Sequence, residues 1–395
     1  MKKEPRMDTN GHECDFMGKL LDGVEVEWKP LGEVGNVLRG KRLTKKELSV
    51  DNKFPVFHGG LDPMGFYHES NRPANTVMVI NVGASAGTVG FSDKDFWSSD
   101  GCFAIQCSGS LNRRFLYYVL IGHQQLLRSR VRVAGIPTLD ANVVEKLPIP
   151  IPCPEDPQKS LEIQAVIVRI LDTFTELTTE LTTELTNRKK QYKHYRDQLL
   201  SFEDGEVEWK TLGELAENLD YMRKPITSGL RESGRFPYYG ASGIVDYVKD
   251  YIYDGDFLLV SEDGANLLAR RTPIAFSISG KNWVNNHAHV LRFETYAERR
   301  YIEYYLNSID LTSYISGAAQ PKLNQANLNS IRIPNPSFED KARNVTILDK
   351  FDTLTHSISE GLPREIELRQ KQYEHYRNML LNFPKPKKVT TNAHE

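Results

Sequence analysis

The chain repeats itself, and this internal repeat constrains the possible folds more than any other feature of the sequence. Glu25–Glu33 (EVEWKPLGE) recurs as Glu206–Glu214 (EVEWKTLGE), and Arg188–Phe202 (RKKQYKHYRDQLLSF) recurs at the same separation as Arg369–Phe383 (RQKQYEHYRNMLLNF). At 395 residues the chain is too long for one ordinary domain and has room for two. The sequence therefore predicts two related modules with a pseudo-two-fold relationship.

Two shorter matches keep the same order along the chain: Ile170–Phe174 with Ile347–Phe351, and Leu147–Pro150 with Ile331–Pro334. Between the matched segments most residues differ. The modules are thus expected to share a scaffold and to carry different surfaces, as suits a protein that reads two different things in the same manner. Leu20–Gly23, before the first repeated tryptophan, also echoes Leu199–Leu200 and Asp204–Gly205 before the second, so the two chain ends are expected to lie close together.

The variable modules, residues 24–153 and 206–337, combine short β-rich runs with turn residues. Each has one helical stretch near its end, at Asn112–Leu127 and at Tyr296–Ile309. Each closes with a segment rich in isoleucine and proline, which interrupts the chain before a long helix begins. The pattern predicts two globular α+β domains.

Two long helices are predicted at 154–205 and 338–384, because apolar side chains recur there at alternating spacings of three and four. The tetrapeptide TELT, written three times over 175–186, inserts a period of four into the first. Pro363 should kink or break the second. A single apolar stripe needs a partner, so we expect an antiparallel coiled coil of the two helices; pairing with another chain is the alternative.

Residues 1–23 are left as an N-terminal arm and 385–395 as a flexible tail. No apolar run is long enough to span a membrane, and the charged N-terminus, with no apolar segment behind it, is not expected to be a secretory signal. The four cysteines show no paired or metal-ligand spacing, which favours a reducing cytoplasm. A formal charge of −2 indicates that any DNA binding uses small basic patches and is helped by partners.

Candidate catalytic and cofactor motifs are incomplete. Gly35–Arg42 approaches a phosphate-binding loop but lacks the magnesium-ligand Ser or Thr, and Gly83–Gly87 lacks the helix and the ribose-binding acid of a dinucleotide site. The His287–His289 pair has no neighbouring metal ligands in sequence. No Ser-His-Asp order and no Asn-Pro-Pro-Tyr segment of a methyltransferase is present. The chain is therefore not expected to be an enzyme, nor to hold a cofactor or metal.

The doubled EVEWKxLGE starts, the doubled QYxHYR helix ends and the TELT repeats closely resemble the specificity subunits of type I restriction–modification enzymes. So does the run GLPREIELR at 361–369. The resemblance is strongest to the subgroup called type IC, and it covers the chain from Leu20 to Phe383 in order.

This resemblance implies two target-recognition domains that each read one half of a split, asymmetric DNA site, spaced by the helices. It further implies two modification subunits that methylate adenine with S-adenosylmethionine, and restriction subunits that use ATP and Mg²⁺ to translocate DNA. A stand-alone DNA-binding regulator or scaffold with two sites is the alternative, although the charge balance does not favour it.

Candidate DNA contacts are side chains able to reach phosphates or base edges. Asn and Gln suit adenine, whereas Arg and Lys suit guanine or phosphate. The candidates in the first module are Lys41, Arg42, Lys45, Lys46, His58, Gly59, Gly60, Ser85, Arg130 and Arg132. The candidates in the second module are Ser242, Asn266, Arg270, Arg271, Asn285, Asn286, His287 and Lys322.

Overall fold

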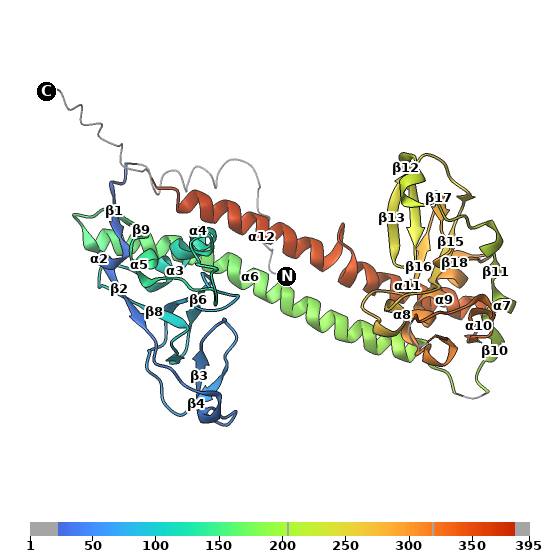
Figure 1. Cartoon of the computed structure of the whole chain (residues 1–395), viewed down its shortest axis with the longest axis horizontal. Coiled ribbons are helices and arrows are strands. Elements are labelled where there is room, and N and C mark those ends of the chain that lie inside the picture. The colour runs from blue at the N-terminus through green and yellow to red at the C-terminus, as the bar shows by residue number, and fades with distance from the viewer. Residues whose placement is uncertain (1–22, 204, 318–319, 384–395) are drawn as a thin grey trace, which may run out of the picture. The chain divides into compact units, whose positions relative to one another are not determined.

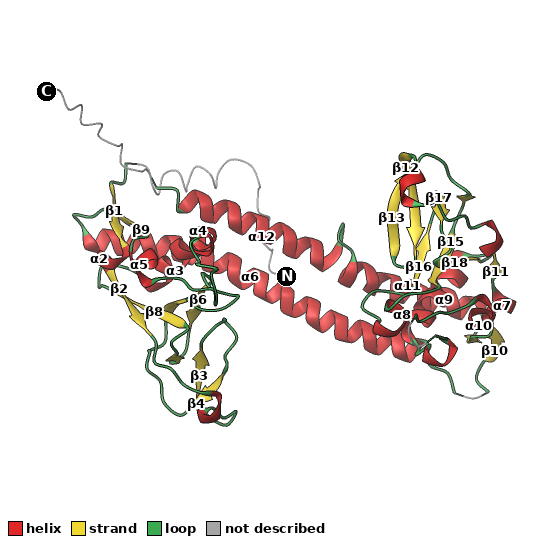
Figure 2. Ribbon diagram, in the orientation of Figure 1, coloured by secondary structure: helices red, strands yellow, loops and turns green. Residues whose placement is uncertain are grey.

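A computed structural model describes residues 23–203, 205–317 and 320–383 of the chain (Figures 1 and 2). It divides into two compact units: residues 1–180 with 366–395, and residues 181–365. Each unit thus contains one variable module and parts of both long helical segments. Nearly all of the predicted N-terminal arm and all of the predicted tail lie outside the described residues.

The first unit has a mixed α+β module built on three sheets. Its sheets have the orders β1-β9, β2-β8-β5-β6 and β4-β3-β7. The strands are β1 (Val26–Pro30), β2 (Gly35–Arg39), β3 (Phe54–Phe57), β4 (Gly65–Tyr67), β5 (Thr76–Ile80), β6 (Val89–Ser92), β7 (Trp97–Ser98), β8 (Cys102–Cys107) and β9 (Pro148–Pro152). The helices are α2 (Leu31–Val34), η1 (Lys45–Glu47), α3 (Arg113–Gly122), α4 (Gln124–Ser129) and α5 (Ala141–Glu145).

The main core of this unit lies between the four-stranded sheet, α3 and the long helix α6 (Pro157–Leu199). Helix α3 contacts β5 and β6, and its buried side chains include Phe115 and Leu116. Ile167 and Leu171 of α6 are fully buried in the same cluster. The helical pattern of the sequence therefore serves to bury one face of α6 against its own module.

The second unit repeats this topology, with one additional edge strand in its third sheet. Its sheets have the orders β10-β19, β11-β18-β15-β16 and β13-β12-β17-β14. The strands are β10 (Glu208–Thr211), β11 (Glu217–Asn218), β12 (Ser233–Gly240), β13 (Gly243–Val248), β14 (Tyr253–Asp254), β15 (Phe257–Ser261), β16 (Ala275–Ile278), β17 (Lys281–Val284), β18 (Ala288–Arg292) and β19 (Arg332–Asn335). The helices are α7 (Leu212–Leu215), η2 (Asp220–Met222), η3 (Ser228–Leu230), α8 (Asn266–Ala269), α9 (Tyr296–Ser308), η4 (Thr312–Tyr314) and α10 (Gln325–Asn329).

The repeat extends through the segments whose sequences differ. In each unit, the strand that carries the repeated tryptophan pairs antiparallel with the Ile-Pro segment. In each unit, the third sheet contains one parallel strand pair, β3–β7 or β12–β17. The predicted helical stretch at 112–127 is two helices, α3 and α4, whereas the stretch at 296–309 is the single helix α9. The predicted α+β fold with an internal repeat is confirmed.

The second helical segment consists of α11 (Phe338–His356) and α12 (Gly361–Leu380). The break lies just before Gly361, whose φ of +76° suits glycine, and a Cβ there would lie 2.3 Å from the carbonyl oxygen of Thr353. Pro363 falls in the first turn of α12, where its missing N–H costs little. The predicted interruption is present, and the glycine turn precedes the proline.

Helices of the same chain pack against each other inside each unit. In the second unit the Asn344 side chain donates to the Leu199 carbonyl at 3.0 Å, and the rings of Phe351 and Tyr195 stack at 5.5 Å. A later residue of α11 thus contacts an earlier residue of α6, so the two helices run antiparallel. In the first unit, Phe174 of α6 stacks on Tyr376 of α12 at 5.1 Å.

Each module is joined to a long helix by the same three side chains. In the first unit, Arg114 Nε donates to Asp172 Oδ1 at 2.8 Å, and the Tyr118 hydroxyl donates to the same oxygen. We call each such set the module–helix joint. The equivalent residues in the second unit are Arg300, Tyr304 and Asp349.

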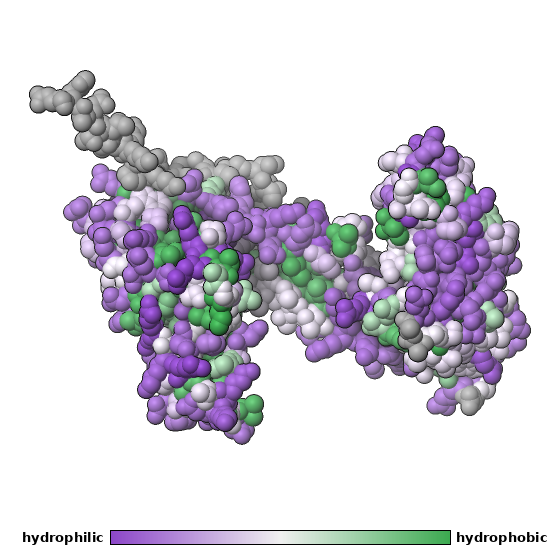
Figure 3. Space-filling model, in the orientation of Figure 1, coloured by the Kyte–Doolittle hydropathy of each residue, from purple (hydrophilic) through white to green (hydrophobic). Residues whose placement is uncertain are grey.

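The two chain ends, which were expected to lie close together, fall outside the described residues. Val24 packs against the core that contains the buried Phe383. Among the described residues, no helix is both long and apolar enough to cross a membrane. Hydrophilic residues prevail on the visible surfaces of both modules (Figure 3).

Candidate nucleic-acid interface

Loops from separate parts of the first module meet along one edge. Backbone hydrogen bonds connect Lys41 N to Ser98 O at 2.9 Å and Ser99 N to Phe57 O at 2.9 Å. A further bond joins Gly83 N to Pro137 O at 2.9 Å. We call the resulting surface the first loop face; it comprises residues 40–42, 58–60, 82–87, 99–101 and 130–138.

The second module forms the same framework with different residues. Lys224 N bonds to Val284 O at 3.4 Å, and Gly264 N bonds to Pro321 O at 3.1 Å. Asn285 N bonds to Tyr239 O at 3.0 Å. The second loop face comprises residues 224–225, 240–242, 263–271, 285–287 and 320–322. In the two faces Lys41 matches Lys224, Ser99 matches Asn285, and Thr138 matches Lys322.

An indole donor fixes the first loop of each face. Trp97 Nε1 donates to Lys41 O at 2.7 Å, and Trp283 Nε1 donates to Lys224 O at 2.6 Å. Both lysine side chains are left exposed. The backbone of Ser99 lies so close to Gly40 that no larger residue fits there, since a Cβ on Gly40 would lie 1.9 Å from Ser99 O. The near match of this segment to a phosphate-binding loop therefore has a packing explanation.

The first loop face brings together most of the residues predicted for it. Those on the face are Lys41, Arg42, His58, Gly59, Gly60, Ser85, Arg130 and Arg132. Arg132 also pairs with Asp140 at 3.0 Å, in an exposed salt bridge. Lys45 and Lys46 lie elsewhere, in η1 beside β4, at the opposite edge of the small sheet from β7.

Arg128, Arg130 and Arg132 alternate in sequence and would share one face of an extended strand, but the structure does not place them in one. Arg128 lies in the last turn of α4, and its backbone packs against Gly87. Arg130 is the C-cap of α4, and Arg132 forms an isolated antiparallel β-bridge with Thr138. Both Arg130 and Arg132 still belong to the loop face.

In the second module the predicted residues divide into exposed side chains and side chains that shape the loops. Ser242, Arg271, Asn286, His287 and Lys322 are exposed on the second loop face.

Three other predicted side chains have local partners. Asn285 is buried and accepts from His287 N at 2.8 Å, and Asn266 accepts from Arg271 N at 3.0 Å. Arg270 donates to the carbonyl of Ile309 at 2.6 Å, beyond the last turn of α9. These contacts give Asn266, Arg270 and Asn285 roles in holding the backbone of the face.

Residue types alone missed two members of the faces. Lys224 is exposed at the position equivalent to Lys41, and Asp100 is exposed at the position equivalent to Asn286. The repeat contained the signal, but these segments are too different in sequence to be aligned without the strand register.

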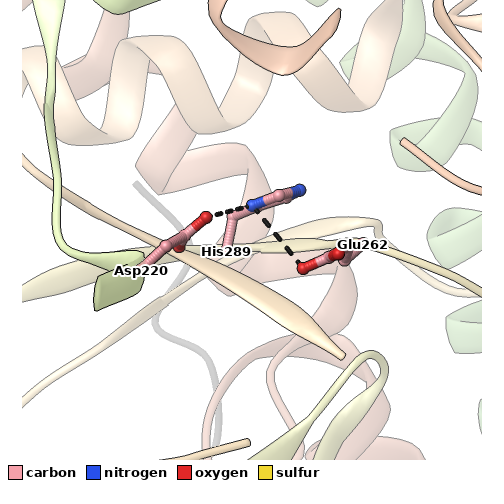
Figure 4. A group of neighbouring side chains, drawn as sticks. All are labelled: Asp220, Glu262 and His289. Carbon is pink, nitrogen blue, oxygen red and sulfur yellow. Dashed lines mark hydrogen bonds and ion pairs between the residues drawn. The ribbon is translucent and has the colours of Figure 1, made fainter. Parts of the chain in front are cut away.

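A buried charge cluster flanks the loops of the second face, and Figure 4 draws three of its side chains, Asp220, Glu262 and His289. His289 is 0% exposed, and its Nδ1 lies 2.5 Å from Asp220 Oδ2 and 3.9 Å from Glu262 Oε2. Its Nε2 donates to the Leu323 carbonyl at 2.7 Å. Arg223 lies between the two carboxylates, 3.2 Å from Asp220 and 2.5 Å from Glu262.

The electrostatics of this cluster favour ionised carboxylates. Burial raises the pKa of Asp220, but the hydrogen bond and charge of His289 and the charge of Arg223 outweigh it and hold that pKa below its ordinary value. Burial likewise raises the pKa of Glu262, and Arg223, His289 and Lys322 together lower it.

This cluster is also the one group of three potential metal ligands among the described residues. Its ligand atoms already face cationic or carbonyl partners: His289 bonds on both ring nitrogens, and Lys322 Nζ lies 3.1 Å from Glu262 Oε1. Nε2 faces a carbonyl and must carry its proton, and both carboxylates already pair with the cationic groups of Arg223 and Lys322. The donor set therefore fits a salt-bridge cluster better than a metal centre.

Two copies of one module, each with loops gathered on a face and each attached to a long helix, define a duplicated recognition protein. A family model described as "Type I restriction modification DNA specificity domain" matches residues 23–190 and again residues 205–368. The chain belongs to this family and is a non-catalytic specificity subunit of a type I restriction–modification system.

Proteins of similar sequence or fold match this chain over nearly its whole length. The chain is 36% identical to the "Type I restriction enzyme EcoR124I/EcoR124II specificity subunit" of Escherichia coli, over 96% of this chain and 99% of that one. It is 34% identical to the EcoprrI specificity subunit of E. coli, over 88% and 93%. Its fold matches the crystal structure of a type I S subunit from M. genitalium with a TM-score of 0.66, at 20% identity, over 93% and 98%. The alternative of a stand-alone regulator gains no support from these comparisons.

Proposed function

We propose that each loop face reads one half of a split, asymmetric site in double-stranded DNA. The observation that carries this proposal is that the two modules repeat one hydrogen-bonded framework while the side chains exposed on it differ. A common framework gives both modules the same approach to DNA, and different side chains give them different half-sites.

The exposed groups have the chemistry that base and phosphate contacts require. The first face offers Lys41, Arg42 and Arg130, which suit phosphates or guanine. The second offers Asn286, suited to adenine, together with basic groups such as Lys322. Asp100 on the first face suits the amino group of cytosine. Because the equivalent positions 100 and 286 hold an acid and an amide, they are the first choice for a difference in sequence preference.

The partners of the chain follow from the same assignment. With a formal charge of −2, the chain alone has little general attraction for DNA, so its binding should depend on an assembly. We assign to that assembly two modification subunits, which dock on the helical region, and restriction subunits. S-adenosylmethionine, ATP and Mg²⁺ belong to these partners. Unpaired thiols at Cys102, Cys107 and Cys153 suit a cytoplasmic location.

Exchange of one module tests the proposal. Residues 24–153 are replaced by the same region of a relative, and methylated adenines are mapped in DNA from cells that express the chimaera with the modification subunit. We expect one half of the site to change and the other to stay. A simultaneous change of both halves would contradict independent reading.

Single substitutions refine the assignment within a face. Asn286→Ala, if it removes a base contact, should cost about 1–3 kcal/mol of discrimination at one base pair. Lys224→Ala, if it removes a phosphate contact, should weaken binding to all sequences about equally and reduce its salt dependence. The purified chain alone should transfer no methyl groups to DNA, and activity without a second subunit would refute the partner assignment.

A further inference from the structure

The buried charge cluster that flanks the second loop face touches most of the loops that form the face. Arg223 immediately precedes Lys224, and its guanidinium donates to the Ala288 carbonyl at 2.9 Å, next to His287. Glu262 immediately precedes the 263–271 loop. The cluster therefore links three segments of the face through their flanking residues.

The fourth segment is held through Lys322. Its ammonium group lies 3.1 Å from the carboxylate of Glu262, and the next residue, Leu323, bonds to Glu262 O through its N–H at 2.8 Å. The carbonyl of Leu323 accepts from His289 at 2.7 Å. The Glu262 side chain is 10% exposed, whereas that of Lys322 is 52% exposed. A buried carboxylate thus holds a surface cation at a fixed place on the loop face.

The first module reaches the same backbone geometry without these charges. Asn81 N bonds to Gly101 O at 3.1 Å as Glu262 N bonds to His287 O at 2.9 Å, which makes Asn81 the counterpart of Glu262. Phe103 and His289 occupy equivalent places in β8 and β18.

Thr138 is the counterpart of Lys322, because Leu139 N bonds to Asn81 O as Leu323 N bonds to Glu262 O. The three equivalent positions are thus Asn, Phe and Thr in one module, and Glu, His and Lys in the other. At these three positions the shared scaffold therefore holds neutral side chains in the first module and members of a salt-bridge cluster in the second.

We propose that Asp220, Arg223, Glu262 and His289 are positioning residues for the second loop face, and that Lys322 is the cation they present to DNA. This inference rests on the proposed function, because it assumes that the face reads DNA. Buried ion pairs fix geometry strongly, since removal of one partner leaves an uncompensated charge. Reading one half-site therefore depends on a charge network that the other half-site does not need.

Two variants that give the second module the residues of the first test the inference. His289→Phe removes the imidazole between the carboxylates, and Lys322→Thr removes the presented cation. Each is made in the full chain and assembled with its modification subunit, after mapping of methylated adenines has established the wild-type site. Methylation rates are then measured on duplexes with one substituted base pair in either half of that site.

We expect His289→Phe to lower discrimination at the second half-site about tenfold and to leave the first half-site unchanged. Lys322→Thr should weaken the second half-site in the same way without affecting the fold, because the side chain is half-exposed. The matched control is Lys249→Thr, which breaks the exposed ion pair to Glu232 at 2.8 Å in the same module. It should change neither half-site.

The outcomes separate the inference from the function on which it rests. If His289→Phe and Lys322→Thr keep full discrimination while Asn286→Ala loses it, the positioning role is refuted and the reading face stands. If Asn286→Ala and Lys224→Ala also leave both half-sites unchanged, the loop face is not the reader. If His289→Phe fails to fold, as circular dichroism would show, Lys322→Thr against Lys249→Thr decides the question.

Discussion

The three TELT repeats at 175–186 offer a way to alter the connection between the modules without altering either module. They lie inside α6, which is one continuous helix of 43 residues. The leucines of the three repeats are all half-buried: Leu177, Leu181 and Leu185. Since they recur every four positions, removal of one repeat brings the next leucine to nearly the same face of the helix.

Helix geometry sets how far a deletion of Thr179–Thr182 would shorten and rotate α6. Four residues at about 1.5 Å each shorten α6 by roughly 6 Å and turn it by about 40° beyond a full turn. Base pairs stack at about 3.4 Å, so the gap between half-sites should shorten by at most about two base pairs. The apolar seam should survive, because loss of a four-residue stutter restores a continuous heptad pattern.

Mapping of methylated adenines in cells that express the deletion variant with the modification subunit measures the gap directly. We expect the same two half-site sequences with a shorter unread spacer. Thr182→Ala with Thr183→Ala keeps the length and should keep the gap, whereas a fourth repeat should lengthen it. Full activity of the deletion variant at an unchanged gap would refute the spacer role and leave the threonines as a solvated stretch of helix.

Three further predictions concern stability. Gly361→Ala should lower the free energy of unfolding by about 1–3 kcal/mol in urea titrations, because φ is +76° and a Cβ meets a carbonyl of α11; Gly122→Ala, in open space, should have little effect. Arg114→Leu should cost about 2 kcal/mol, because Asp172 then loses its cationic partner in the module–helix joint and keeps the Tyr118 hydroxyl; an unchanged thermal midpoint would argue against the joint. The lowered pKa of Asp220 contributes stability that is present above its ordinary value of 3.8 and is lost as the pH falls further. The thermal midpoint of Asp220→Asn should therefore depend less on pH than that of the wild type as the pH falls below about 4.

The parts of the fold that the sequence predicted are those with local signals. A heptad pattern and a helix-breaking proline are each recognised from residues close together in sequence, so α6 and the break before α12 could be predicted. The order of strands was not, since β2 pairs with β8 across a long stretch of chain and the register depends on packing. Only the structure showed that the unlike interiors of the two modules have the same topology.

The candidate site was predictable as a surface but not residue by residue. Arg271 and Arg270 are adjacent and chemically identical, yet one is exposed on the face and the other bonds to the carbonyl of Ile309. Side-chain type states what a residue is able to bind and says nothing of which partner is nearest. Lys224 was missed for the converse reason, because its counterpart Lys41 is identified only by equivalent hydrogen bonds.

The two modules share the residues that attach them to the helices and differ in the residues that support their loop faces. The module–helix joint is chemically identical in both halves, with Arg, Tyr and Asp making the same contacts at equivalent positions. The residues that support the loop faces differ, since Asn81 and Phe103 of the first module occupy the places of Glu262 and His289 in the second. A module that must attach to its helix in one fixed way cannot vary the joint. A face that must distinguish different half-sites can vary both its exposed side chains and the groups that support them. Specificity in this chain therefore extends one layer below the surface that would contact DNA.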